Sequence, residues 1–244
     1  EARKDVYVEK PLSLTISEGR RMVQAAEKYG RITSMGVQRR SSVLCRKAVE
    51  IVQRGEIGQV TFARCFHIRN EAPRGNGHPP DSSPPPELDW DLWLGPAPQV
   101  PFNENRCLYK YRWFRNYSGG QLTNFGTHYL DLIQWAIGKD APSGVVAIGG
   151  QYAVQDNRDV PDTLEVVWEY PGGPLVTFTQ INANGAPGTK LGSGVELRGT
   201  QGTIYCGGPM LEVVPEKVLE DELPVTGPIL RASGRKLTTV TVGF

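Results

Sequence analysis

Apolar positions recur with two different periods along the chain, and these periods divide it into three parts. The first part has two short apolar runs, 6–8 and 31–37, on either side of apolar positions that recur at helical spacing between 16 and 29. We therefore predict a strand, a helix and a strand over residues 5–37. A helix of this length between two strands is typical of a crossover, so the two strands are expected to be parallel.

The ends of this first helix carry specific signals. Thr15 and Glu18 have the spacing of a capping box, and Gly30 suits the position just after the last turn. Two strands do not make a stable sheet on their own. We therefore expect residues 5–37 to belong to a larger α/β sheet.

The second part combines a helix, a strand and a long loop. Residues 44–52 are apolar at helical spacing and end at Gly55, whereas residues 60–68 alternate as in a strand. Residues 72–101 contain nine prolines and three glycines, which predicts a long loop of the kind that often carries function. The tryptophans and leucines of residues 88–95 predict one or two helical turns within it.

The third part begins with the clearest helix, between residues 119 and 138, and is otherwise β-rich. Its predicted apolar face consists of Leu122, Phe125, Tyr129, Leu132, Ile133, Ala136 and Ile137. Strands are predicted at 145–148, 163–170, 175–181, 195–198, 203–206, 211–214 and 237–244. Turns at 171–174 and 199–202 predict hairpins. The fold class is therefore α+β, with a large, mainly antiparallel C-terminal sheet.

Composition narrows the range of functions. The 244 residues include 27 Lys plus Arg and 26 Asp plus Glu, a net charge of +1, which argues against nucleic-acid partners and a polybasic membrane surface. No apolar run approaches the roughly 18 residues of a membrane span. The four cysteines are scattered without a CxxC pair, as in proteins of a reduced compartment, and we expect a cytoplasmic location.

Four residues of the helix at 119–138 form a polar stripe opposite its apolar face: Asn124, His128, Asp131 and Trp135. One interpretation is a solvated face, which every amphipathic helix has. The other is a ligand site, because an amide, an imidazole and a carboxylate on one stripe can converge on one molecule. Histidine titrates near neutrality and is the commonest general acid or base.

A second candidate is the segment Glu9-Lys10-Pro11, which directly follows a predicted strand. In open parallel sheets, ligands bind beyond the carboxyl ends of the strands. Lys10 could donate a hydrogen bond to a substrate hydroxyl there, and Pro11 could fix a tight turn with a cis peptide bond. The alternative is a surface loop with two cancelling charges.

Other polar residues predict no metal centre. His67 lies on a strand and His78 in the Pro-rich loop, and neither has a partner at ligand spacing. Asp156, Asp159 and Asp162 lack the glycine and terminal glutamate of a calcium loop, so a polar loop is expected there. The chain also contains no GxGxxG, P-loop or GxSxG motif.

Six segments, in order, resemble the Gfo/Idh/MocA family of oxidoreductases, named after glucose–fructose oxidoreductase and inositol dehydrogenase. They are the EKP segment with its helix at 8–30, and the segments 36–40, 51–58, 88–96, 119–131 and 199–203. The resemblance implies two domains. Residues 1–40 would be the remnant of a Rossmann domain that binds NAD or NADP, and residues 41–244 a substrate-binding and oligomerisation domain with helices on one face of an open sheet.

The resemblance also implies roles for individual residues. Lys10, Asn124 and His128 would be catalytic, with Lys10 contacting substrate and nicotinamide and His128 exchanging a proton with the reacting hydroxyl. The cofactor would be bound by Glu9, Lys10, Pro11 and Gln38. The substrate would be bound by Arg40, Arg112, Trp113 and Asp131.

The chain departs from the family pattern in two respects. Asn124 stands where the family usually has an aspartate, four residues before the histidine, and an amide cannot relay a proton. The glycine-rich phosphate loop and the returning C-terminal helix of the family are not found in these 244 residues. We expect a chain truncated at both ends, and no NAD or NADP binding by residues 1–244 alone.

The sequence thus predicts an NAD(P)-dependent oxidoreductase that transfers a hydride between the nicotinamide and a sugar, polyol or similar hydroxylated small molecule. We expect the isolated segment to be inactive and the intact protein to be a homo-oligomer that associates through its β-sheet. Two alternatives remain open at this point. One is an NAD-dependent glycoside hydrolase of the same family, and the other is a non-catalytic dimerisation or sensing module.

Overall fold

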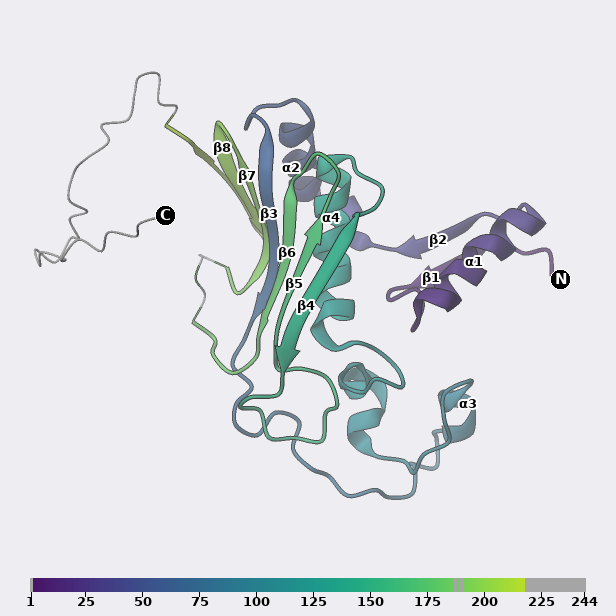
Figure 1. Cartoon of the computed structure of the whole chain (residues 1–244). Helices are drawn as coiled ribbons and strands as arrows, with labels where there is room; N and C mark the ends of the chain where they lie inside the picture. Colours follow the sequence, from purple (N-terminus) through teal and green to yellow (C-terminus); the bar gives the residue numbers. More distant parts are fainter. Residues whose placement is uncertain (1, 187, 189–190, 218–244) are drawn as a thin grey trace, which may run out of the picture.

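A computed structural model describes residues 2–186, 188 and 191–217. Its N-terminal part is a small parallel sheet of β1 (Val6–Glu9) and β2 (Thr33–Gly36), connected by helix α1 (Ile16–Tyr29) (Figure 1). The predicted capping box is present, and Gly30 ends the helix in the left-handed conformation with a φ of 55°. The prediction of two parallel strands and a crossover helix is confirmed.

The apolar face of this unit is exposed rather than packed. Among the described residues, none packs over α1 closely enough to bury any of its side chains, and Ile16 is 88% exposed. Met22, Val23 and Tyr29 are about half exposed and line, with Val6, an apolar hollow of about 940 Å³. The stripe that the pattern predicts as a buried face therefore exists, but within the described residues it lacks a partner.

The main body is one sheet of seven strands within the described residues. Its order is β4 (Gly144–Gly150), β5 (Thr163–Glu169), β6 (Leu175–Ile181), β3 (Val60–Ile68), β7 (Ser193–Gly199), β8 (Gly202–Gly207) and β9 (Met210–Pro215). β3 and β6 are parallel, and the other neighbouring pairs are antiparallel. The predicted α+β class with a mainly antiparallel sheet is confirmed. The strand predicted at 237–244 lies outside the described residues.

Helices α2 (Val43–Gln53) and α4 (Thr127–Ile137) cover one face of this sheet, as Figure 1 shows. Their apolar residues form the core with the inward-facing residues of the strands. The four cysteines are buried free thiols, and the Sγ atoms of Cys45 and Cys206 lie 3.9 Å apart in this core. The opposite face of the sheet carries neither helix.

The long segment between β3 and α4 forms short turns rather than regular helices. They are α3 (Trp90–Leu94) and the 3-10 turns η2 (Glu104–Arg106) and η3 (Leu108–Trp113); a further 3-10 turn, η1 (Gln38–Ser41), precedes α2. The helical turn predicted within residues 88–95 is confirmed as α3. Trp90 stabilises it, because its indole stacks on Trp93 with ring centroids 4.8 Å apart and donates to the Val100 carbonyl at 2.9 Å.

The helix predicted between residues 119 and 138 is present, but its first part is less regular than expected. A π-helical turn, η4 (Leu122–Gly126), precedes α4, and Gly138 ends α4 in the left-handed conformation. Gly120 has a φ of 69°, outside the helical region, so the helix cannot extend further toward the N-terminus. Chains often adopt such π-turns at functional sites.

Candidate active site

The small parallel sheet meets the main body through Lys10 and Asn124. Lys10 follows β1, and its ammonium donates to the Asn124 side-chain oxygen at 2.6 Å and to the Asn124 carbonyl at 3.3 Å. The Asn124 amide nitrogen in turn donates to Gln121 Oε1 at 3.0 Å. Two predicted catalytic residues, 114 positions apart in the sequence, are thus in direct contact.

The Lys10 ammonium lies in an environment that disfavours its charge. Partial burial and the nearby Arg112 guanidinium lower the pKa of Lys10, and Glu9 opposes them only in part. The Asn124 side chain orients the ammonium without neutralising it, because an amide carries no charge. Lys10 is therefore a hydrogen-bond donor with an uncompensated charge.

His128 lies one helical turn after Asn124, near the start of α4. Its side chain is buried, and its Nδ1 has no hydrogen-bond partner among the described residues. Burial, and then the charges of Lys10 and Arg39, lower the pKa of His128 to about 4, while Asp131 has a weaker opposite effect. The imidazole is therefore neutral near pH 7 and able to accept a proton.

The remaining members of the helical stripe contact protein groups. Asp131 accepts from Arg40 through both of its carboxylate oxygens, at distances between 2.7 and 3.1 Å. The Arg40 guanidinium also lies 5.2 Å from the ring centroid of Trp135, which packs against the core. The stripe therefore faces protein side chains along most of its length rather than open solvent.

A pocket of about 350 Å³ lies beside the N-terminal end of this helix. Gln121 and Phe125 line one side of it, and Arg112 and Trp113 of η3 line another. Arg69, which directly follows β3, also borders it. Gln121 is hydrogen-bonded to Asn124, which accepts from Lys10, so two hydrogen bonds connect this pocket to the Lys10 ammonium.

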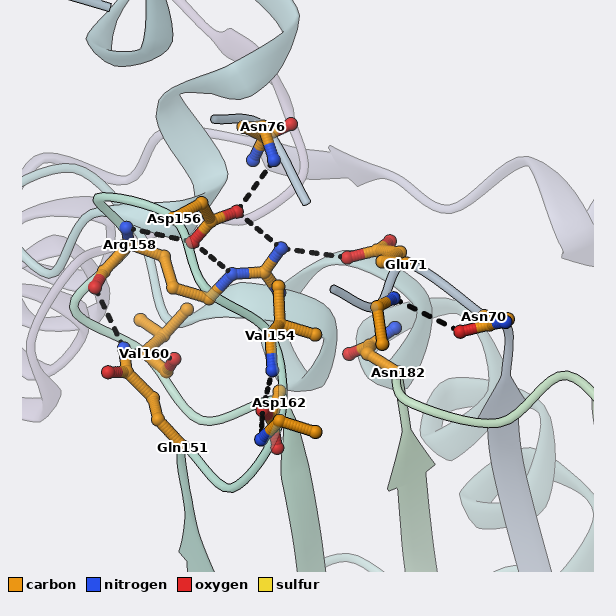
Figure 2. A network of polar contacts seen from close by, with 12 residues as sticks. Asn70, Glu71, Asn76, Gln151, Val154, Asp156, Arg158, Val160, Asp162 and Asn182 are labelled. Atoms are coloured by element: carbon orange, nitrogen blue, oxygen red, sulfur yellow. Dashed lines mark hydrogen bonds and ion pairs between the residues drawn. The ribbon is translucent and has the colours of Figure 1, made fainter. Parts of the chain in front are cut away.

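Buried charges hold one wall of the pocket in place (Figure 2). The Arg158 side chain is fully buried; its Nε lies 2.7 Å from Asp156 Oδ1, and its Nη2 lies 2.7 Å from Asp156 Oδ2 and 2.9 Å from Glu71. Asp156 also accepts from the backbone N–H of Asn76 at 2.7 Å. The guanidinium lies 4.1 Å from the ring centroid of Trp113. Arg158 thus connects the loop after β3 with the loop before β5.

The three aspartates of the loop before β5 all bind protein groups, as expected for a polar loop. Asp162 accepts three backbone N–H groups, at distances of 2.8 to 3.0 Å, from residues 152–154. Asp159 accepts from the Arg115 N–H at 2.6 Å. Together with Asp156 they fix the shape of this loop.

Comparison with known families agrees with this geometry. A family model described as "Oxidoreductase family, C-terminal alpha/beta domain", of the Gfo/Idh/MocA type, matches residues 67–207. The chain belongs to the Gfo/Idh/MocA oxidoreductase family. The predicted family membership is thereby confirmed.

Two curated relatives of this Gfo/Idh/MocA chain are named as oxidoreductases. Mouse trans-1,2-dihydrobenzene-1,2-diol dehydrogenase is 24% identical over 198 residues, covering 80% of this chain and 47% of the mouse protein. The putative oxidoreductase YteT of Bacillus subtilis is 28% identical over 150 residues, covering 59% of this chain and 27% of YteT. The chain therefore spans about half the length of the mouse relative and about a quarter of the length of YteT.

Solved structures share the fold at lower identity. The WlbA dehydrogenase from Bordetella pertussis, in complex with NADH and UDP-GlcNAcA, is 18% identical with a TM-score of 0.59, covering 88% of this chain and 57% of WlbA. Levoglucosan dehydrogenase, in complex with NADH and levoglucosan, is 20% identical with a TM-score of 0.56, covering 84% of this chain and 48% of that enzyme.

Of the other residues predicted for the site of this Gfo/Idh/MocA chain, Glu9 and Gln38 are exposed and Trp113 is buried. Glu9 and Gln38 are exposed at the carboxyl ends of β1 and β2, and the peptide bond between Lys10 and Pro11 is cis. Trp113 borders the pocket but is itself buried beneath Arg158.

Three residues near the site escape sequence reasoning. Gln121 could be found from its helical spacing, three residues before Asn124. Arg39 donates to the Tyr129 hydroxyl at 3.0 Å and affects the pKa of His128, while Arg69 reaches the pocket from the end of β3. No periodicity in the sequence indicates either arginine.

None of the helices within residues 2–186 and 191–217 is long and apolar enough to cross a membrane.

Proposed function

We propose that this chain is part of an NAD(P)-dependent dehydrogenase that transfers a hydride between the nicotinamide and a hydroxyl-bearing carbon of a sugar, polyol or similar small molecule. The observation that carries this proposal is that a cationic donor, Lys10, is hydrogen-bonded to Asn124 one helical turn before the buried imidazole of His128, whose lowered pKa keeps it neutral. The names of the relatives support it, because they include two NADH-bound dehydrogenases, one with a sugar nucleotide and one with an anhydrosugar.

We assign residues 1–40 to the nucleotide-binding domain and residues 41–244 to the substrate domain. Glu9 is the last residue of β1, Lys10 follows it, and Gln38 follows β2, so that all three lie at the carboxyl edge of a parallel sheet. This edge is where open α/β sheets bind their ligands, and polar donors there fit a nicotinamide cofactor. The exposed apolar residues of α1 fit burial by further strands and helices of the same domain.

Lys10 and His128 would both act on the substrate hydroxyl, one as a hydrogen-bond donor and the other as a proton acceptor. A bound NAD or NADP would supply the hydride acceptor, and Glu9, Lys10, Pro11 and Gln38 would hold it. Lys10 donates a hydrogen bond to the hydroxyl oxygen and stabilises the negative charge that develops on it. His128, neutral before the reaction, accepts the hydroxyl proton. Asn124 holds the Lys10 ammonium in position through its 2.6 Å hydrogen bond.

The test is turnover by the full-length gene product. Purified protein is incubated with NAD or NADP and a panel of neutral sugars, polyols and sugar acids, and the formation of reduced nicotinamide is followed. We expect reduction with at least one substrate, and a large loss of turnover in Lys10→Gln. Lys47→Gln is the matched control, because Lys47 is an exposed residue of α2 that pairs with Glu50.

Two results would contradict this proposal. The first is a full panel without reduction of either cofactor. The second is release of a leaving group from aryl glycosides with retained NAD and no net reduction, which would indicate the glycoside hydrolase alternative.

A further inference from the structure

Two guanidinium groups that border the pocket, those of Arg69 and Arg112, have no carboxylate partner of their own among the described residues. Arg112 stacks on Tyr109, with its central carbon 3.6 Å from the ring centroid. Arg69 follows β3 on another side of the pocket. Among the described residues, neither arginine forms an ion pair with a carboxylate. Arginine side chains that border a pocket and have no carboxylate partner in the protein are suited to bind an anionic ligand.

The acidic residue that borders the same pocket, Glu71, already has an ion-pair partner in the pocket wall. Glu71 lies 2.9 Å from Arg158, whose charge is shared with the buried Asp156. Counting Arg69, Arg112 and Arg158 against Glu71 and Asp156, the pocket and its supporting network carry a net charge of +1. Lys10, which two hydrogen bonds connect to Gln121 through Asn124, adds a further positive charge.

The positive charges of these arginines also lower the pKa values of nearby titratable groups. Arg112 contributes to the lowered pKa of Lys10, after burial. For His67, burial is again the largest cause, and the charges of Arg69 and Arg112 help to lower its pKa to about 4. The positive potential therefore extends from the pocket to the proposed catalytic lysine.

The pocket also has the size and polarity for a small polar ligand. Its volume of about 350 Å³ is at the lower end of the range for ligand pockets. Besides the two arginines, the amides of Asn70 and Gln121 border it, and Gln121 is almost fully buried. Guanidinium groups bind carboxylate and phosphate oxygens through paired, charge-assisted hydrogen bonds, while amides bind hydroxyls.

We propose that this pocket binds an anionic group of the substrate through Arg112 and Arg69, so that the substrate is an acidic sugar and not a neutral polyol. The anion is a carboxylate or a phosphate, which present the same oxygen chemistry to a guanidinium. The inference rests on the proposed function, because it takes Lys10 and His128 as the place where the substrate reacts. An anion beside Gln121 would be linked to Lys10 through Asn124 by two hydrogen bonds.

The experiment measures binding first, because binding does not depend on turnover. The full-length protein is titrated calorimetrically with glucuronate, glucose 6-phosphate and glucose. We expect one of the two anions to bind at least tenfold more tightly than glucose, and the better one identifies the group. Its affinity should fall about 10-fold to 100-fold in Arg112→Gln, the usual loss when a hydrogen bond to a charged group is removed. It should also weaken as salt is raised.

Matched variants and turnover complete the test. Arg54→Gln is the control, because Arg54 is an exposed residue at the end of α2 that pairs with Glu50. With substrates that are oxidised, the ratio of kcat/KM for the acidic sugar to that for its neutral counterpart should fall at least tenfold in Arg112→Gln and in Arg69→Gln. Binding of glucose as tight as that of both anions, or an Arg112→Gln variant with unchanged anion affinity, would overturn the inference.

These outcomes separate the inference from the proposed function. If an anion binds through Arg112 but no sugar is oxidised, the anion site stands and the dehydrogenase proposal fails. If neutral sugars are oxidised with no preference for acids, the dehydrogenase proposal stands and the anion site fails.

Discussion

The Lys10 ammonium and the Asn124 side-chain oxygen are 2.6 Å apart, although 114 positions separate them in the sequence. This hydrogen bond connects the end of β1 to the π-helical turn before α4, and therefore the proposed cofactor domain to the proposed substrate domain. The resemblance to the family implies an aspartate at this position. With asparagine, the contact carries no negative charge.

Changing Asn124 to aspartate tests what the missing charge does. A carboxylate beside Lys10 and one turn from His128 should raise the pKa of both, because it favours their charged forms. If oxidation requires neutral His128, the rate rises as pH passes through the pKa of that imidazole. A higher pKa therefore moves the acidic limb of the pH–rate profile to higher pH. The measurement is kcat/KM against pH for the full-length enzyme and for Asn124→Asp.

An exposed asparagine provides the control for this change. Asn116 lies in the loop before α4, and Asn116→Asp should leave the profile in place. An acidic limb that does not move in Asn124→Asp would show that position 124 has no electrostatic link to the proton acceptor.

Removing the imidazole tests the proton acceptor itself. We expect His128→Ala to lower turnover by about 10²–10⁴-fold, the usual share of general acid–base catalysis. The affinity for the cofactor should change little, because His128 lies in the proposed substrate domain and not at the carboxyl edge of β1 and β2. The exposed His78 gives the matched control, and His78→Ala should stay within a factor of about two of the parent. Near-normal turnover in His128→Ala would remove His128 from the mechanism.

Local elements of this fold could be predicted well from the sequence. The first helix, its capping box and the left-handed Gly30 follow from short-range rules, and β6 matches the predicted bounds 175–181. These features depend on residues a few positions apart. The sheet order could not be predicted, because it requires β3 and β6 to pair across more than a hundred residues.

Strand β3 shows why an alternating pattern does not identify the face that packs. Its smaller residues, Ala63 and Cys65, face the helices, while Phe66 lies on the other face and is also buried. Small side chains allow α4 to approach the sheet closely, and Phe66 is shielded by the Arg64 guanidinium, 5.4 Å from its ring centroid. The sequence shows that side chains alternate between two faces of the strand, but which of the two faces packs against the helices depends on tertiary structure.

In the candidate site, too, contacts between residues close in the sequence could be predicted and contacts between distant residues could not. The helical stripe brought Asn124 and His128 together, because both lie within one turn of one helix. The pocket wall could not be predicted, since Arg158 joins Asp156, two positions away, to Glu71, 87 positions away. A charged loop gives no sequence signal that two of its side chains will be buried.

The open face of the sheet leads to a prediction about assembly. Val166 and Trp168 of β5 face the helices, so Val146 and Ile148 of β4, which pair with Val167 and Glu165, lie on the opposite face. Val146 and Ile148 are 62% and 73% exposed. An apolar surface of this kind is typical of an interface, and homo-oligomerisation through this face stays a prediction.

The assembly prediction is tested by placing a charge on that face. Ile148→Lys in the full-length protein should shift an oligomer toward monomer, measured by light scattering at tens of micromolar. Val43→Lys is the control, since Val43 is 78% exposed at the start of α2. A parent protein that is already monomeric at these concentrations would rule out association through the sheet.

Replacing Arg158 tests whether the buried charge network stabilises the fold. Arg158→Met keeps most of the volume of the side chain but leaves the buried Asp156 carboxylate without its partner. Removing one member of a buried ion pair typically costs about 3–5 kcal/mol of the free energy of unfolding, because the other charge is left uncompensated. Urea unfolding of the full-length protein and the variant measures the difference. Asp156→Asn on the Arg158→Met background should cost less than the sum of the two single changes, since both remove the same interaction.

The dependence of this cost on pH distinguishes a charge effect from a packing effect. Burial by itself raises the pKa of Asp156, but hydrogen bonds from Arg158 and from the Asn76 N–H outweigh it and hold the pKa below its usual value. A lowered carboxyl pKa contributes stability above the pKa of the unfolded chain, and this contribution is lost as pH falls through the folded value. In Arg158→Met burial would dominate, and Asp156 would be protonated at higher pH. The gap in unfolding free energy between parent and variant should therefore be largest near neutral pH and narrow below about pH 4. A gap that stays constant from neutral to acidic pH would mean that Arg158 acts through its volume and its contact with Trp113 and not through its charge.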